Sequence, residues 1–189
     1  MGFPCRVYMK TRRKDRRDSA EEKEQLKQIK DCLITVKDVM EIHLDLSFFR
    51  TISNSIYLGE DGEFHKMNTK KRNKFYDTKT FDAYGNYNFQ YNNLNIYFFC
   101  KSTFNNGGSQ DNICCEIGHF INNIKTRNEK RKNISDELYI LMLDGNYWND
   151  INEKNMNLPE NVIYCNTNNL LKKIILQVKK WKKNLVNPK

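Results

Sequence analysis

The sequence predicts a mixed α/β domain in which a small central sheet is flanked by helices. Two apolar runs carry this prediction, Leu94–Cys100 and Leu138–Leu143. Such runs, with little polar alternation, are typical of strands that are covered on both faces. One amphipathic helix separates them, which is the spacing of a βαβ unit, so we expect the two strands to be neighbours with the helix packed on one face.

The chain before the sheet is expected to begin with a helix. Ser19 and Glu22 have the spacing of a capping box at a helix N-terminus. Apolar residues from Leu26 onward recur every three to four residues, which favours a helix to about Val39. After a break, we expect a further helical segment through Leu44–Phe48.

Turn and strand patterns fill the segment between this helix and the first apolar run. The sequence GEDG at Gly59–Gly62 predicts a turn, and residues 66–80 are basic and polar, which is typical of a loop. From Phe81 onward, aromatic and polar residues alternate. This alternation predicts a strand that pairs with the first apolar run.

The remaining elements follow the first apolar run. Ser109 can cap a helix whose apolar positions extend from Ile113 to Ile124. Val162–Cys165 is expected to be a short third strand, and Asn169–Leu185 an amphipathic C-terminal helix. Strands that alternate with helices in this way indicate an α/β architecture.

Length and composition favour one globular unit. The 189 residues, 39% of them hydrophobic, suffice for a core without structural metal. We expect residues 1–18 to form a basic N-terminal arm and residues 19–189 a single domain. No stretch has the ~18 uncharged apolar residues of a membrane span, and the N-terminus lacks the apolar run of a signal peptide. A soluble, cytoplasmic protein without a membrane partner is therefore expected.

The six cysteines do not indicate a metal site. They include no CxxC pair and no Cys/His pair at zinc-finger spacing. Structural zinc sites in proteins depend on such closely spaced ligands. A zinc site is therefore not expected.

The charge of the chain is positive and clustered. There are 32 Lys and Arg against 23 Asp and Glu, a net charge of +9, and 28 of the 32 cations fall in four clusters. Such clusters, joined in one fold, suit a polyanion such as nucleic acid, although lysines that only increase solubility are the alternative. The candidates for nucleic-acid binding are Lys70, Lys71, Arg72, Lys74, Lys125, Arg127, Lys130 and Arg131.

Three charged residues surround the first apolar run in a pattern that suits hydrolysis of a phosphodiester. Asp82 precedes the run, Lys101 ends it, and Glu116 lies about two turns into the following helix. Carboxylates hold a hard divalent cation that neutralises the phosphate and lowers the pKa of a bound water, and a lysine can orient that water. Each residue alone is more often a turn aspartate, a strand-end lysine or a surface glutamate.

At these residues the chain resembles the PD-(D/E)XK nuclease superfamily, and within it the FokI-type restriction endonuclease cleavage domain. The resemblance covers about 90 of 189 residues, from Asp82 to Leu171, and includes IYFFCK, SQDNICCEIGHF and ELYILMLDGNYW. It implies a restriction-endonuclease-like fold, Mg²⁺ bound by Asp82, catalysis by Lys101, and supporting roles for Gln110 and Glu116.

The chain departs from the family pattern at two positions. Phe81 replaces the proline before Asp82, which alters only the local backbone preference. Phe99 replaces the second acid of the D/E-x-K triplet, and a phenyl ring cannot ligate a cation. Either Glu116 supplies the missing metal-binding carboxylate from the helix, or the domain has lost cleavage.

The resemblance and the charge together predict a Mg²⁺-dependent DNA endonuclease of restriction type. It would act on duplex DNA as a homodimer or as the cleavage subunit of a larger assembly. The alternative is a catalytically degenerate nucleic-acid-binding subunit with the same fold, and a further one is a basic scaffold that binds no nucleic acid. Asp144, before Gly145, is interpreted as a strand-ending turn in preference to another acidic ligand.

Overall fold

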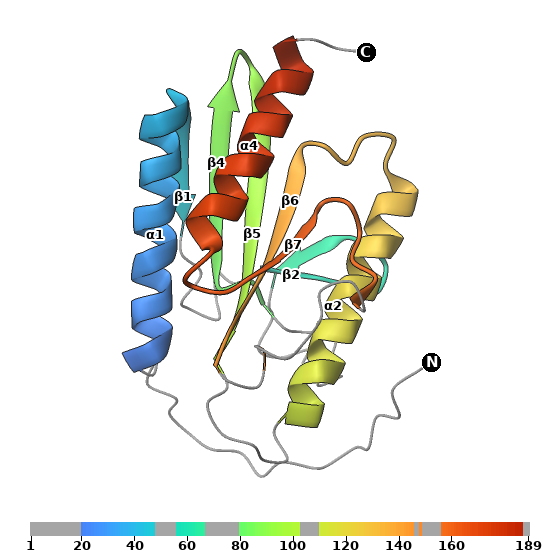
Figure 1. Cartoon of the computed structure of the whole chain (residues 1–189). Helices are drawn as coiled ribbons and strands as arrows, with labels where there is room; N and C mark the ends of the chain where they lie inside the picture. The colour runs from blue at the N-terminus through green and yellow to red at the C-terminus, as the bar shows by residue number, and fades with distance from the viewer. Residues whose placement is uncertain are drawn as a thin grey trace.

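The structure of the chain, a computed structural model, describes residues 20–47, 56–66, 80–102, 110–145, 148 and 156–186 (Figure 1). These residues form a mixed α/β fold with a five-stranded sheet, a separate two-stranded hairpin and flanking helices. In chain order the elements are α1 (Ala20–Met40), β1 (His43–Ser47), β2 (Ile56–Leu58), β3 (Phe64–Lys66), β4 (Ala83–Phe89), β5 (Asn92–Ser102), α2 (Gln110–Lys130), β6 (Glu137–Asp144), β7 (Val162–Cys165) and α4 (Leu170–Val186).

The predicted pairing of the two apolar runs is confirmed. The sheet has the order β1-β4-β5-β6-β7, in which β1, β4 and β5 are antiparallel neighbours and β5, β6 and β7 are parallel neighbours. Ile96 of β5 lies opposite Leu138 of β6, and Lys101 lies opposite Leu143. The parallel pairing requires a crossover, which α2 provides.

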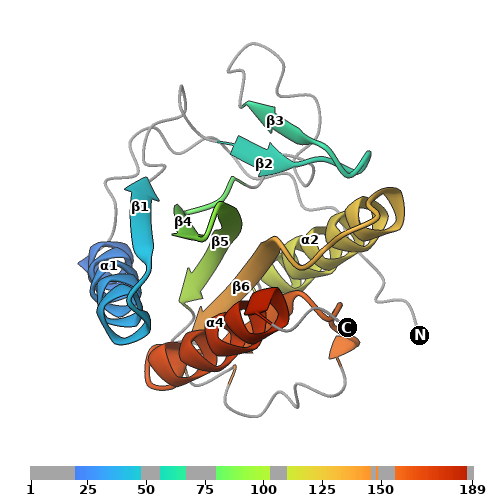
Figure 2. The ribbon, with the colours of Figure 1, turned by 90° about the horizontal axis from the view of Figure 1, so that it is seen from above.

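Helices cover both faces of the sheet, which explains why β5 and β6 are apolar throughout. In Figure 2, α1 and α4 lie on one face, and α2 and the β2–β3 hairpin lie on the other. Ile96 and Phe98 pack toward α1 and α4, whereas Tyr97 and Phe99 pack toward α2. Alternate residues of a strand point to opposite faces, so a strand buried on both faces needs apolar side chains at every position.

The helical expectation for Leu44–Phe48 is wrong for its described part, which lies in β1. Glu41 has a left-handed backbone (φ 52°), which ends α1. Beyond it, Leu44 is half-buried between the exposed residues His43 and Asp45. This period of two is the pattern of an edge strand, and the segment is too short to show it clearly in the sequence.

The predicted turn at Gly59–Gly62 is confirmed, and it connects β2 to β3. The hairpin is attached to α2, since Nδ2 of Asn123 donates to the carbonyl of Leu58 at 2.8 Å. Gly62 has a φ of 71°, and a Cβ there would lie 2.9 Å from the backbone of Arg127. Glycine therefore permits the close approach of the turn to the helix. The arm at residues 1–18, Ser19 and most of the expected loop 66–80 lie outside the described residues.

Candidate active site

Asp82 lies where the pairing of β4 with β5 ends. Its backbone N–H donates to the carbonyl of Phe98 at 2.8 Å, and its Oδ2 accepts a hydrogen bond from the backbone N–H of Cys100 at 2.8 Å. The side chain thus reaches across to β5, one residue before Lys101. The carboxylate is thereby fixed beside the end of the central strand.

Lys101 and Glu116 form an ion pair at this end of the sheet. Nζ of Lys101, the next-to-last residue of β5, lies 2.6 Å from Oε2 of Glu116 on α2. Their side chains are 19% and 18% exposed, and Oε2 itself is buried. Since removing two charges from water is costly, each of these groups depends on the other for stabilisation.

Phe99 is part of the core beneath the pair. Its side chain is 0% exposed and stacks on Phe120 of α2 with 4.8 Å between ring centroids. Nζ of Lys101 lies 5.7 Å from the centroid of the Phe99 ring. Phe99, two residues before Lys101, is thus an aromatic packing position in this chain.

The predicted residues Asp82, Lys101 and Glu116 therefore gather around the end of β5. Asp82 is joined to the backbone of Cys100, and Glu116 is joined to the side chain of the next residue, Lys101. Among the described residues, no group of three or more His, Cys, Asp and Glu side chains is arranged to hold a metal ion. Two carboxylates nevertheless suit Mg²⁺, because this cation commonly takes one or two from the protein and the rest from water and phosphate.

Several predicted site residues have side chains outside the described part of the chain. Gln110 is the first residue of α2, but its side chain lies outside the described part of the chain. The basic residues Lys70, Lys71, Arg72 and Lys74 also lie outside it. Their roles stay predictions from the sequence.

Arg127, a predicted nucleic-acid contact, instead lies inside the protein. Its side chain is buried, with Nε and Nη2 each 2.7 Å from the carboxylate of Glu137, and Nη1 donates to the carbonyl of Gly62 at 3.0 Å. The guanidinium also lies 4.2 Å from the ring centroid of Phe64. It therefore ties α2 to β6 and to the β2–β3 hairpin, and it does not present its charge to a phosphate.

Glu137 is the centre of a buried polar network that the sequence did not reveal. Its carboxylate also accepts hydrogen bonds from Nη1 of Arg131 and from the hydroxyl of Tyr139, both at 2.7 Å. Burial alone would raise the pKa of Glu137, but the hydrogen bonds from Arg127 and Tyr139 and the two positive charges outweigh it, so the pKa lies below its ordinary value. The hydrogen bond to Glu137 raises the pKa of Arg127 in turn.

The other predicted basic contacts, on α2 and directly after it, differ in their surroundings. Nη2 of Arg131 also bonds to both carboxylate oxygens of Asp136, and its Nε donates to the carbonyl of Asn133, so this guanidinium too is held within the chain. Lys130 is exposed, and its Nζ donates to the carbonyl of Asp61. Lys125 is half-buried. The role of Lys125 and Lys130 in phosphate binding stays a prediction from the sequence.

Asp144 belongs to the opposite face of the sheet. Its carboxylate accepts hydrogen bonds from the backbone N–H and the hydroxyl of Thr167, at 2.8 and 2.7 Å, and from Nε2 of Gln25 on α1, at 2.8 Å. Gly145 follows with a φ of 111°. These bonds fit the interpretation of Asp144 as a strand-ending residue, and they connect β6 to α1 and to the start of α4.

Comparisons with known proteins returned no relatives. No protein-family model matches the chain, and neither the curated proteins nor the solved structures contain a match. Within the described ranges, the helices fall short of the length and apolar character that crossing a membrane requires.

Proposed function

We propose that this chain is a Mg²⁺-dependent DNA endonuclease of restriction type with a restriction-endonuclease-like fold. The observation that carries the proposal is the ion pair between Lys101 and Glu116 at the end of β5, where the carboxylate of Asp82 accepts a hydrogen bond from the backbone of the neighbouring residue Cys100. Phosphodiester hydrolysis needs a cation-binding carboxylate and a lysine within reach of the same phosphate. We propose that Asp82 and Glu116 provide this carboxylate function and that Lys101 is this lysine.

The proposed roles follow from the surroundings of each residue. Asp82 and Glu116 would hold Mg²⁺, which when bound neutralises the phosphate and lowers the pKa of its water. Asp82 is oriented by the backbone N–H of Cys100. Lys101 offsets the buried negative charge of Glu116 and presents a cation to the scissile phosphate. The aromatic side chains of Phe99 and Phe120 close the site from the core side, which excludes water from beneath it.

Substrate binding would depend on the basic residues around the site. Lys125 and Lys130 on α2, together with the basic segment that contains Lys70, Lys71, Arg72 and Lys74, are proposed to contact backbone phosphates of duplex DNA. Phosphate contacts position a protein on DNA without reading its sequence. One site of this kind cuts one strand, so a double-strand break would need a homodimer or a partner subunit.

A second candidate function is a catalytically degenerate nucleic-acid-binding subunit with the same fold. The observation in its favour is Phe99, which is buried at the position of the family's second acid. In that case the ion pair between Lys101 and Glu116 would be structural only. The basic surface would be retained, and cleavage would be lost.

Incubation of supercoiled plasmid with the full chain, in Mg²⁺ and in EDTA, separates the two candidates. The nuclease proposal predicts nicked or linear plasmid in Mg²⁺ alone, and loss of cutting in Lys101→Ala. Lys30→Ala, which removes one exposed lysine from α1, is the matched control and should cut normally. Salt-sensitive binding without cutting in Mg²⁺ would support the degenerate subunit and contradict the nuclease.

A further inference from the structure

The tip of the β4–β5 hairpin carries an exposed aromatic side chain on a strained backbone. Gln90 and Tyr91 connect Phe89 to its strand partner Asn92, and their φ angles are 49° and 65°. A two-residue turn with positive φ at both positions is a type I′ turn, which strongly favours Asn and Gly. The side chain of Tyr91 is 100% exposed. Neither the fold nor the core therefore explains a tyrosine at this position.

The surroundings of Tyr91 are neutral and rich in amides. Asn88, Gln90, Asn92 and Asn93 flank it in the hairpin, and Nδ2 of Asn88 donates to Oδ1 of Asn93 across the two strands at 2.9 Å. The tip contains no carboxylate. Amide side chains can form hydrogen bonds with the edges of unpaired bases, while an aromatic ring offers a surface on which a base can stack.

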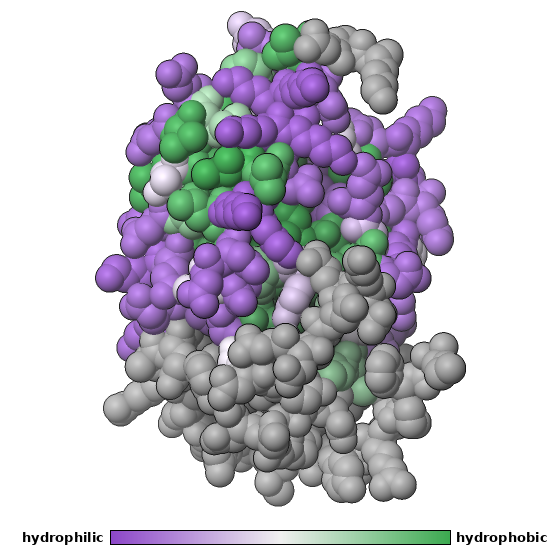
Figure 3. Space-filling view, in the orientation of Figure 1, coloured by the Kyte–Doolittle hydropathy of each residue, from purple (hydrophilic) through white to green (hydrophobic). Residues whose placement is uncertain are grey.

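The basic helix α4 lies against this hairpin. Nζ of Lys182 is 4.4 Å from the ring centroid of Phe89 and donates to the carbonyl of Met40 at 2.8 Å. Lys182 thus contacts the hairpin about one turn before the end of α4. The helix contains six lysines and no acidic residue, and the face that it forms with α1 has hydrophilic side chains around a patch of hydrophobic ones (Figure 3).

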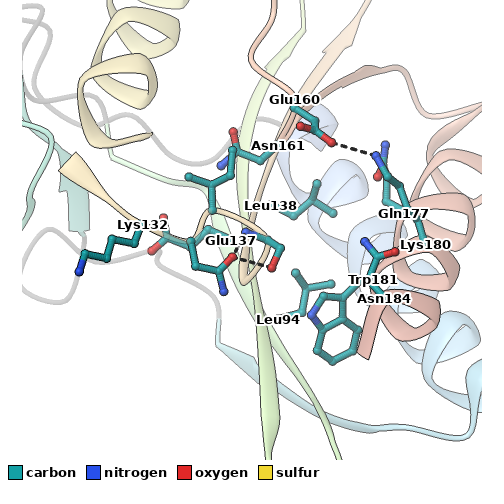
Figure 4. A pocket seen from close by; sticks show the side chains of 13 residues that line it. Leu94, Lys132, Glu137, Leu138, Glu160, Asn161, Gln177, Lys180, Trp181 and Asn184 are labelled. Atoms are coloured by element: carbon teal, nitrogen blue, oxygen red, sulfur yellow. Dashed lines mark hydrogen bonds and ion pairs between the residues drawn. The ribbon is translucent and has the colours of Figure 1, made fainter. Parts of the chain in front are cut away.

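A pocket of about 240 Å³ is lined in part by Leu94, which follows Tyr91 by three residues on β5. The indole of Trp181 projects from α4 beside Leu94, and the lining also includes amides such as Asn184 and the carboxylates of Glu137 and Glu160 (Figure 4). Lys132 and Lys180 lie at the pocket as well, the latter paired with Glu160 at 3.0 Å. The pocket thus has apolar, amide and cationic groups, and it also contains the carboxylates of Glu137 and Glu160, which pair with Arg127 and Lys180.

We propose that Tyr91, with the lysines of α4, forms a binding site for an unpaired stretch of a DNA strand, one base of which stacks on the tyrosine ring. A strand of this kind alternates planar bases with phosphates, and single-strand binding sites combine aromatic rings with cations in the same way. A protein partner would need a contiguous apolar patch around Tyr91, whereas its chain neighbours are amides.

The inference rests on the proposed nucleic-acid function and extends it to the class of substrate. Tyr91 and Lys101 lie near opposite ends of β5. Lys101 is nine residues further along the strand than Asn92, which corresponds to about 30 Å at ~3.3 Å per residue. The two sites are therefore separate. The substrate would be DNA in which an unpaired segment lies about 30 Å from the phosphodiester that is cut.

Fluorescence anisotropy in EDTA, with no cleavage possible, tests the site. The probes are a fluorescein-labelled 12-residue oligo(dT) and an abasic oligomer with the same number of phosphates. Wild type should bind oligo(dT) about tenfold more tightly than the abasic oligomer, which is the effect expected of one stacked base. Tyr91→Gly should abolish this difference, whereas Tyr91→Phe should retain it.

Gln90→Gly is the matched control, because it relieves the same backbone strain in the same turn but keeps the tyrosine. Both glycine variants should melt no lower than wild type, since glycine suits each turn position. Equal oligo(dT) affinity in Tyr91→Gly and Gln90→Gly would overturn the inference and leave the nuclease proposal intact. If wild type binds none of the two oligomers and duplex DNA, both the inference about Tyr91 and the nuclease proposal are overturned.

Discussion

Nζ of Lys101 lies 2.6 Å from Oε2 of Glu116, and this ion pair joins the end of the central strand to the helix that covers it. The side chains are 19% and 18% exposed and Oε2 of Glu116 is buried, so water stabilises these charges less than it would at the surface. The same two residues are the lysine and the helix carboxylate of the proposed active site. The pair therefore has consequences for stability as well as for cleavage.

Glu116→Gln should destabilise the fold, because it removes the negative charge that lies 2.6 Å from the ammonium group of Lys101. We expect the free energy of unfolding in urea to fall by about 1–3 kcal/mol, as for a buried polar group that loses its partner. In the double variant Lys101→Met with Glu116→Gln, part of this loss should be recovered. Additive effects of the two single changes would show that the residues do not interact in solution.

Phe99→Asp should be strongly destabilising. It removes a ring stacked on Phe120 and buries a carboxylate in its place, so we expect the free energy of unfolding to fall by more than about 3 kcal/mol. Phe99→Leu, which keeps an apolar side chain, is the control and should lose less. Melting curves of the two variants with and without Mg²⁺ measure the effect.

If Mg²⁺ restores the stability of Phe99→Asp, the new carboxylate binds the cation beside Lys101. A gain in plasmid cutting by the folded variant would then show that the missing acid had limited the activity. A Phe99→Asp protein as stable as wild type in the absence of Mg²⁺ would contradict the buried position of this side chain.

Alanine substitution should lower stability at Arg127 and weaken DNA binding at Lys125. Arg127→Ala leaves the carboxylate of Glu137 buried with fewer partners, so the free energy of unfolding should fall by about 3–5 kcal/mol. Lys125→Ala should leave stability within about 0.5 kcal/mol and weaken binding to duplex DNA. If Arg127→Ala unfolds at the same denaturant concentration as wild type and only weakens DNA binding, the buried structural role of Arg127 is contradicted.

Stability should fall at acidic pH through protonation of Glu137. Its pKa in the folded protein lies below the ordinary value of 4.5, so the ionised carboxylate contributes stability above pH 4.5 that is lost as the pH falls through the folded pKa. The difference in unfolding free energy between wild type and Glu137→Gln should therefore shrink below pH 4.5. A difference that stays constant from neutral to acidic pH would contradict the ionised network.

The periodicity of the apolar residues was enough to predict the centre of the fold. It located β5, α2 and β6 and predicted their mutual packing, because strands buried on both faces and an amphipathic helix leave distinct patterns in the sequence. It did not predict β1, where the left-handed conformation of Glu41 ends α1 and only a few residues follow. Edge strands bury little side-chain surface and so leave a weak pattern.

The candidate site was predictable in part. The spacing of Asp82, Lys101 and Glu116 indicated residues that the fold brings to the end of β5. The burial of Arg127 was not predictable, because it falls in a basic run and its partner Glu137 is ten residues away on a different element. Charge alone does not show whether an arginine faces solvent or a buried carboxylate.

The most direct test of the account is the initial rate of nicking of supercoiled plasmid as Mg²⁺ is varied, for wild type, Asp82→Asn and Glu116→Gln side by side. The amides keep the shape of each side chain but remove the charge that holds the cation. The account predicts a Mg²⁺-dependent rate in wild type and loss of that rate in both variants, with binding of duplex DNA in EDTA preserved. Cutting by both variants at the wild-type rate, or no cutting by folded wild type at any Mg²⁺ concentration, would contradict it.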